Sequence, residues 1–502
     1  MMIERTNIIN GALTVSLFVT VSFVVLWFLA PGTSPALPQA MYDVGIFRTI
    51  GQCWAQGGLP YVDLFDQKGP LLYLIYALVA VIGPSKWWIF IVECLTLTLS
   101  ASIFYKVGTT LGCSRSNSRL ASVVMILAVV ILCEMGGTVE EFSLPFELLP
   151  LWLLSRFLTG KSSALNVCSF VTGLCFGCVA LIRINNNAVI TGICIVMAIW
   201  LIRYRYYRKL VYSISLFAAG LIVAILPFIV YFACHGALSA MFYSVYYVGW
   251  LYKTGWGAGG FMPNPLFIII YLISLISLTA SCVFAGDRNS RIVLYIVLAG
   301  CLVNILINLG STSYTHYLVM FAPFMAFMWL YFDWKRWCIY LVFVILSACF
   351  LYITRENMVY RVRSAFYTDH NVDPVVGNFA IIPPEERNSI YVCGTIDLAD
   401  IPLSLGTLPA GKYFFQQNMY GQLDESLYND IIDDFITTDP LWVIAEYEDS
   451  DGSLSMLKPY MAEYELVTVN DEQFNPYRTR MAVYRKKRPH DWGVRPDMTE
   501  RK

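Results

Sequence analysis

Long apolar ranges alternate with short polar ones over the first 353 residues of the chain. Eleven of these ranges are close to the roughly 20 apolar residues that a helix needs to cross a bilayer. They are 8–30, 87–105, 120–136, 143–158, 166–182, 188–202, 209–233, 265–286, 291–309, 317–332 and 337–353. The pattern predicts an all-α polytopic membrane bundle of about 11 spans over residues 1–353.

One apolar range does not fit that series. Leu71–Gly83 has only 13 residues and lies between Pro70 and Pro84. Because this length is short for a crossing, we expect a partial helix at the membrane interface. It would belong to the first outer loop, residues 31–86.

The last part of the chain, residues 354–502, has a different pattern. Short runs typical of strands occur at 389–394, 412–415, 441–447, 464–469 and 481–487. Residues 424–436 have helical periodicity, with Leu427, Ile431 and Phe435 on one face. We therefore predict a small soluble α/β domain. It contains no glycine-rich phosphate loop and no nucleophile elbow.

Composition agrees with this division. The chain is 57% hydrophobic and 14% charged, whereas soluble domains carry roughly 25% charged residues. Residues 354–502 contain 24 acidic and 15 basic side chains, and residues 1–353 contain 11 and 19. We expect an integral protein of the cell (plasma) membrane, with lipid around it and no nucleic-acid partner.

The basic residues predict the orientation of the bundle. Short Lys- and Arg-containing loops, such as the RYRYYRK run that begins at Arg203, lie between alternate spans. Such loops concentrate on the cytoplasmic side. We therefore place the N-terminus in the cytoplasm and the C-terminal domain outside it.

Acidic residues of the bundle gather at the predicted outer face, where carboxylates indicate a functional site. Asp43 precedes an amphipathic run, Val44–Ala55. A partly desolvated carboxylate there could act as a general base. The alternative is a helix N-cap, which is a common role for Asp before a helix.

A second polar segment, DLFDQKGP, contains Asp63, Asp66 and Lys68. Its carboxylates could bind a polar substrate or a divalent cation, and the lysine could hold a phosphate. The alternative is a loop that neutralises itself by salt bridges.

Further candidates lie in three later outer segments. Glu140 and Glu141 follow Thr138, so a capping box is the alternative to a substrate role. Arg183 precedes three asparagines and could bind phosphate or simply snorkel. His316 and Tyr317 lie late in the bundle, where a satisfied structural histidine is the alternative.

These motifs together resemble the GT-C superfamily of membrane glycosyltransferases that use polyprenyl-phosphate sugars. That superfamily includes enzymes like protein O-mannosyltransferase and lipid A aminoarabinose transferase. The resembling segments are MYDVGIF around Asp43, GxPYxD…DxKGPL over 58–71, EEF after 139, RxN at 183 and HY at 316. The likeness covers roughly residues 8–353 and is greatest to bacterial members with a small extracytoplasmic tail.

The resemblance implies a mechanism centred on the first outer loop. Asp43 would be the general base on the acceptor hydroxyl, and Lys68 and Arg183 would neutralise the departing lipid phosphate. Asp63, Asp66, Glu140 and Glu141 would shape the acceptor or a metal site. His316 and Tyr317 would be further substrate- or phosphate-binding residues. Many relatives have two adjacent acids where this chain has Asp43-Val44, so a divalent metal, Mg²⁺ or Mn²⁺, stays open and no ligand is assigned.

The resemblance implies a polyprenyl-phosphate sugar as donor, with a glycan, lipid or protein as acceptor. Two other functions remain as alternatives. A transporter or flippase of lipid-linked glycans is favoured only by Glu93, an acid inside a span. A glycan polymerase or ligase would be expected to use a large late loop, but residues 234–264 contain only His235 and Lys253 as chargeable groups.

Overall fold

All eleven predicted apolar ranges are helical in the computed structural model. The structure describes residues 2–37, 42–83, 85–162, 164–255, 264–309, 314–333, 335, 337–366, 379–470 and 480–487. The long helices are α1 (Met2–Leu29), α4 (Lys86–Thr110), α5 (Arg115–Leu132), α6 (Val139–Leu158), α7 (Leu165–Arg183), α8 (Ala188–Arg203), α9 (Tyr207–Cys234), α12 (Pro265–Phe284), α13 (Arg288–Asn308) and α15 (Trp337–Phe366). The range 317–332 forms α14 (Ala322–Ala326) between the 3-10 helices η3 (Thr315–Phe321) and η4 (Phe327–Tyr331).

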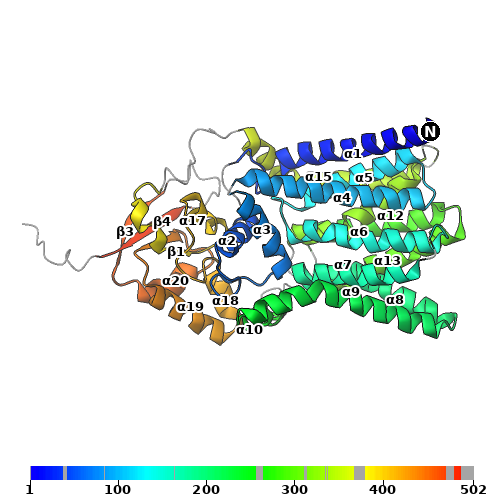
Figure 1. The fold of residues 1–502 in the computed structure, drawn as a ribbon. Helices are drawn as coiled ribbons and strands as arrows, with labels where there is room; N and C mark the ends of the chain where they lie inside the picture. The colour runs from blue at the N-terminus through cyan, green and yellow to red at the C-terminus, as the bar shows by residue number, and fades with distance from the viewer. Residues whose placement is uncertain are drawn as a thin grey trace, which may run out of the picture.

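The long helices run side by side as one bundle (Figure 1). Within the described ranges, seven segments are long and apolar enough to cross a membrane, with α7 and α8 counted as one. The predicted membrane bundle is therefore confirmed, while the number of eleven crossings stays a prediction.

Helices α7 and α9 approach each other closely because glycines line their contact. A Cβ atom at Gly173 would lie 1.9 Å from the carbonyl oxygen of Phe217, and one at Gly220 would lie 2.1 Å from that of Phe170. Small residues of this kind allow membrane helices to pack backbone against backbone. The pair forms one wall of the bundle.

Two shorter helices lie between the bundle and the C-terminal region (Figure 1). They are α2 (Asp43–Ala55) and α3 (Pro70–Ile82). Helix α3 has 13 residues and begins at Pro70, whose fixed φ suits the first helical turn. The predicted short helix is therefore present. The connection between α8 and α9 lies at the opposite end of the bundle.

The C-terminal region is a four-stranded mixed sheet with helices, which confirms the predicted α/β class. The strands are β1 (Ile390–Cys393), β2 (Trp442–Glu446), β3 (Tyr464–Val469) and β4 (Met481–Lys486), in the order β1-β2-β4-β3. Strands β1 and β2 are parallel, and the other pairs are antiparallel. The helical elements are η6 (Pro384–Ser389), η7 (Ile396–Leu398), α17 (Ile401–Ser404), α18 (Gln417–Leu423), α19 (Glu425–Thr438), α20 (Ser453–Leu457) and η8 (Lys458–Tyr460).

Two details differ from the sequence expectation or refine it. The strand predicted at 412–415 is wrong, because the backbone amides of Lys412 and Tyr413 donate to the Asp434 carboxylate instead of to a neighbouring strand. Helix α15 extends to Phe366. The domain boundary predicted between residues 353 and 354 therefore falls inside a continuous helix.

The C-terminal region is seated on the first outer loop. Arg48 on α2 forms an ion pair with the buried Asp400 at 3.3 Å. The Thr49 hydroxyl donates to the carbonyl of Ala399, and the Phe65 amide donates to the carbonyl of Lys412. These contacts fix the position of the region over the end of the bundle.

Candidate functional site

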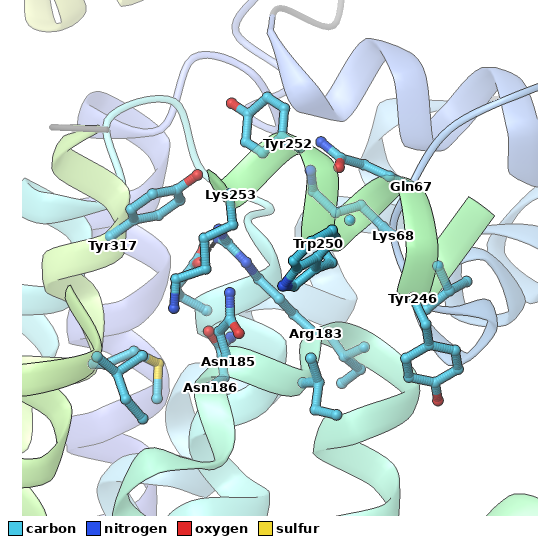
Figure 2. A pocket seen from close by; sticks show the side chains of 18 of the residues that line it. Gln67, Lys68, Arg183, Asn185, Asn186, Tyr246, Trp250, Tyr252, Lys253 and Tyr317 are labelled. Atoms are coloured by element: carbon cyan, nitrogen blue, oxygen red, sulfur yellow. Dashed lines mark hydrogen bonds and ion pairs between the residues drawn. The ribbon is translucent and has the colours of Figure 1, made fainter. Parts of the chain in front are cut away.

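A cavity of about 270 Å³ lies where α7, α13 and the segment before α3 meet. Its lining contains Lys68, Arg183 and Lys253, together with Asn185 and Asn186 (Figure 2). No acid other than Glu140 lines it among the described residues. We call this space the cationic cavity, and it is suited to an anionic group.

Lys68 reaches this cavity because its neighbour is a glycine. The amide of Gly69 donates to the carbonyl of Ile182 at 2.9 Å. A Cβ atom at Gly69 would lie 2.1 Å from the carbonyl oxygen of Leu181, so a larger residue would push the loop away from α7. The loop thus places Lys68 beside the end of the helix that carries Arg183.

Arg183 is held by two contacts at the end of α7. Its Nη1 lies 2.7 Å from Oε1 of Glu140, and its guanidinium lies 4.0 Å from the ring centroid of Tyr317. These contacts hold the guanidinium at the wall of the cationic cavity. A guanidinium has five N–H donors, so the pair with Glu140 leaves donors for a second anion.

Lys253 comes from a late segment that closes the cavity. This segment consists of α10 (Leu238–Phe242), the π-helix η2 (Tyr243–Val248) and α11 (Gly249–Thr254), and π-helices are frequent at functional sites. Burial, reinforced by the charge of Arg183, lowers the pKa of Lys253. A bound anion would oppose this shift and favour the charged amine.

A second cavity of about 130 Å³ adjoins the first. Its lining includes Asp43, Glu134 and His316, and we call it the acidic cavity. Four residues line both cavities: Gln67, Lys68, Tyr252 and Tyr317. The two spaces are therefore neighbouring parts of one site that share Lys68. Arg183 and Lys253 line one part, and the carboxylates of Asp43 and Glu134 line the other.

Asp43 is the first residue of α2 and does not cap it. The N-cap position is Tyr42, and no side-chain cap bond is formed. Asp43 is half-buried, and its carboxylate makes no hydrogen bond or ion pair within the described part of the chain. The N-cap alternative is wrong, and the carboxylate is available to a substrate.

Glu134 is the second acid of the acidic cavity. Although burial alone would raise its pKa, the neighbouring imidazole lowers it. His316 Nδ1 lies 4.0 Å from Glu134 Oε2, so this effect is one of charge more than of a direct hydrogen bond. Glu134 is therefore ionised near neutral pH.

Backbone strain is concentrated around the acidic cavity. Three non-glycine residues that line it have left-handed φ angles: Tyr42 (56°), Glu134 (62°) and Gln416 (47°). Such conformations cost about 1–3 kcal/mol each and cluster at functional sites. The three residues come from separate segments of the chain, and their side chains meet at the acidic cavity.

The C-terminal region forms the roof of the acidic cavity. Ile396, Phe415, Gln416 and Tyr420 line it. The amide of Gln416 donates to the carbonyl of Gly394 at 2.6 Å, which ties the roof to the end of β1. This bond holds the roof to the sheet of the C-terminal region.

Asp66 is a structural acid, although it lies at the cavity wall. It is 2% exposed, and its carboxylate accepts hydrogen bonds from the Gln67 amide and the Tyr73 hydroxyl, each at 2.6 Å. A third bond comes from the Tyr420 hydroxyl at 3.2 Å. Asp66 thus links the first outer loop to the roof.

Two other predicted residues lie outside both cavities. Asp63 is exposed, and its carboxylate accepts the Leu59 amide at 2.6 Å within its own turn. Glu141 accepts the Thr138 amide at 2.9 Å, so the predicted capping box is confirmed. Within the described ranges, the 63–68 segment forms no internal salt bridge, so that alternative is wrong.

The sequence interpretation missed three residues of the site. Lys253 was visible as one of two chargeable groups in the late loop, and Glu134 as one of the acids at the outer face. Gln416 had no signal, because a polar residue in a soluble domain is ordinary. The described residues include no group of three or more His, Cys, Asp or Glu side chains that could hold a metal ion.

The chain is similar to known proteins in its fold and, over part of its length, in its sequence. The fold is similar to that of ArnT from Cupriavidus metallidurans bound to undecaprenyl phosphate, with a TM-score of 0.58, 12% identity, and coverage of 94% of this chain and 97% of that one. The apo ArnT structure has a TM-score of 0.57, 12% identity, and coverage of 96% and 98%. No curated protein matches the chain. The family model described as "Putative competence-induced protein Ccs4 N-terminal domain" matches residues 6–332, so the chain belongs to the Ccs4 N-terminal domain family and has an ArnT-like fold.

Proposed function

We propose that this protein is a membrane glycosyltransferase that transfers a sugar from a polyprenyl-phosphate donor to a cell-envelope acceptor. The observation that carries the proposal is the adjoining pair of cavities, one lined by cations and one by carboxylates. The fold it shares with ArnT, a protein crystallised with undecaprenyl phosphate, supports the same donor class. The site would face the extracytoplasmic side, as the basic loops predict.

The donor phosphate would occupy the cationic cavity. Lys68, Arg183 and Lys253 line it, and its wall also includes Ile184 and Ile307, beside which a prenyl chain could leave toward the lipid. Charge-assisted contacts are roughly twice as strong as neutral hydrogen bonds. The sugar would then lie at the junction of the cavities, near Tyr252 and Tyr317.

The acceptor would occupy the acidic cavity. Its hydroxyl proton moves to the Asp43 carboxylate while the hydroxyl oxygen bonds to the anomeric carbon of the sugar. The bond from that carbon to the phosphate oxygen breaks, and the electron pair remains on the phosphate. The three cations stabilise that developing charge.

A transport function is less well supported. Glu93, the residue that favoured it, is 1% exposed and accepts the Gly137 amide at 2.8 Å. It therefore anchors the second outer loop inside the fold.

The experiment compares cells with and without the protein. Mass spectrometry of envelope glycans, lipids and proteins should show one sugar mass lost in its absence and restored by the wild-type gene. Asp43→Asn should fail to restore it at equal membrane abundance, whereas Asp63→Asn should succeed. The proposal is overturned if no envelope molecule changes mass and purified protein releases no undecaprenyl phosphate from lipid-linked sugar.

A further inference from the structure

An apolar cavity lies far from the site, toward the other end of α7. It has a volume of about 340 Å³ and is lined by side chains of α6, α7, α8 and α9, none of them charged. Its hydroxyl groups on α7 are satisfied internally: Ser169 donates to the carbonyl of Leu165, and Thr172 donates to that of Cys168. The surface of the cavity is therefore almost entirely apolar and suits a hydrocarbon chain.

A basic turn lies at the mouth of this cavity. Leu201 and Leu210 line the cavity, and between them the turn from α8 to α9 carries four exposed cations: Arg203, Arg205, Arg208 and Lys209. No described acid forms an ion pair with any of them. The turn thus has unneutralised positive charge directly beside the apolar cavity.

Aromatic residues mark the same turn as an interfacial segment. The rings of Trp200 and Tyr204 are 5.2 Å apart, and those of Tyr204 and Tyr206 are 6.3 Å apart. Lys209 lies 4.7 Å from the ring centroid of Tyr206. Tyr and Trp are enriched where helices leave the hydrocarbon core. The cavity would then lie in the acyl region, with the cations at headgroup level.

We propose that this site binds one anionic phospholipid, with an acyl chain in the apolar cavity and its headgroup on the four cations. Clusters of four or more basic residues beside membrane helices favour anionic lipids. A free phosphate would leave the cavity unused, and a zwitterionic lipid would leave the cations without net counter-charge. The site is separate from the cationic cavity, because Leu165 and Arg183 lie at opposite ends of α7.

The test uses the full-length protein in nanodiscs and two probes, phosphatidylglycerol and phosphatidylcholine, detected by native mass spectrometry. Wild type should retain phosphatidylglycerol at least tenfold more than phosphatidylcholine, and high salt should reduce the preference. A variant with all four cations changed to Gln should lose the preference. Ala198→Phe, which fills the apolar cavity, should no longer retain phosphatidylglycerol, although the four cations of the turn are unchanged.

The matched control is Arg288→Gln with Arg291→Gln, exposed cations of the α12–α13 turn at the same end of the bundle. This control variant should retain phosphatidylglycerol as wild type does. Equal retention of both probes by wild type overturns the proposal, as does equal loss in the control. Retention of phosphatidylglycerol that Lys68→Met abolishes and the turn variant does not would also overturn it. Ala198→Phe and the turn variant act on different parts of the site, so misfolding of one leaves the other decisive.

Discussion

The cationic and acidic cavities share a wall but differ in how the chain builds them. Every residue that lines the cationic cavity lies between Gln67 and Met320, inside the range that matches the family model. The acidic cavity takes four lining residues from 396–420, outside that range. One cavity is therefore a property of the bundle, whereas the other is completed by the C-terminal region.

The difference indicates a division of labour within the proposed function. Phosphate recognition depends on helices that pack on one another, and it can stay constant in proteins with the same bundle. The acceptor side depends on a region seated across the first outer loop. Acceptor choice can therefore change with the C-terminal region without disturbing the donor site, and variants can test each side separately.

The largest effect is expected on the acidic side. Asp43→Asn should lower the rate of sugar transfer by about 10²–10⁴-fold, because an amide cannot accept the acceptor proton. Binding of undecaprenyl phosphate to the purified protein should not change. Asp63→Asn is the control, since Asp63 lies outside both cavities. If Asp43→Asn transfers sugar at nearly the wild-type rate, Asp43 is not the general base, and Glu134 is the next candidate.

Variants on the cationic side should affect donor binding. Lys68→Met and Lys253→Met should each weaken undecaprenyl phosphate binding roughly 10- to 150-fold, which corresponds to a charge-assisted contact of about 1.5–3 kcal/mol. Arg183→Met needs Glu140→Gln beside it, because Glu140 would otherwise be a buried unpaired charge. Isothermal titration calorimetry measures the affinities, with Lys458→Met as an exposed control. Normal affinity in all three variants would leave the cavity with no role in phosphate binding.

The lowered pKa of Lys253 predicts a pH dependence of the same cavity. The amine is charged below its pKa and neutral above it, so undecaprenyl phosphate binding should fall as pH rises through a range lower than that of an ordinary lysine. Lys253→Met should lack this alkaline decrease. The affinity that wild type loses at high pH should not exceed the affinity that the Lys253→Met substitution removes. An identical pH profile in both proteins would assign the decrease to another group.

The smallest effect is expected at the roof. Gln416→Gly should raise the free energy of unfolding by about 1 kcal/mol, because glycine relieves a left-handed backbone while adding some unfolded-state entropy. Gln416→Ala keeps the strain and should not stabilise the protein. Both variants should lower use of the acceptor while leaving undecaprenyl phosphate affinity unchanged. Thermal unfolding in detergent measures the first effect, and a lower melting temperature for the glycine variant would show that the strain is not local.

The sequence by itself determined which segments are helices and where charge is exceptional. Apolar ranges of fixed length predict spans because the bilayer demands them, and all eleven ranges are helical. In so apolar a chain each charge needs a reason, and Asp43, Lys68 and Arg183 could therefore be selected from the sequence. All three line the two cavities.

Only the tertiary structure decided what each charged residue does. Asp43, Asp63 and Asp66 are similar in sequence context, yet they differ in the fold. The carboxylate of Asp43 accepts no hydrogen bond within the described residues, that of Asp63 closes a turn, and that of Asp66 accepts three hydrogen bonds. Their partners include groups far away in the chain, such as Tyr420, which periodicity does not reveal. Residues 412–415 likewise had the apolar pattern of a strand, but the Asp434 carboxylate accepts the amides that a strand would have paired. Local pattern determines secondary structure where burial requires it, whereas the fate of a polar group depends on which distant donor or acceptor the fold brings to it.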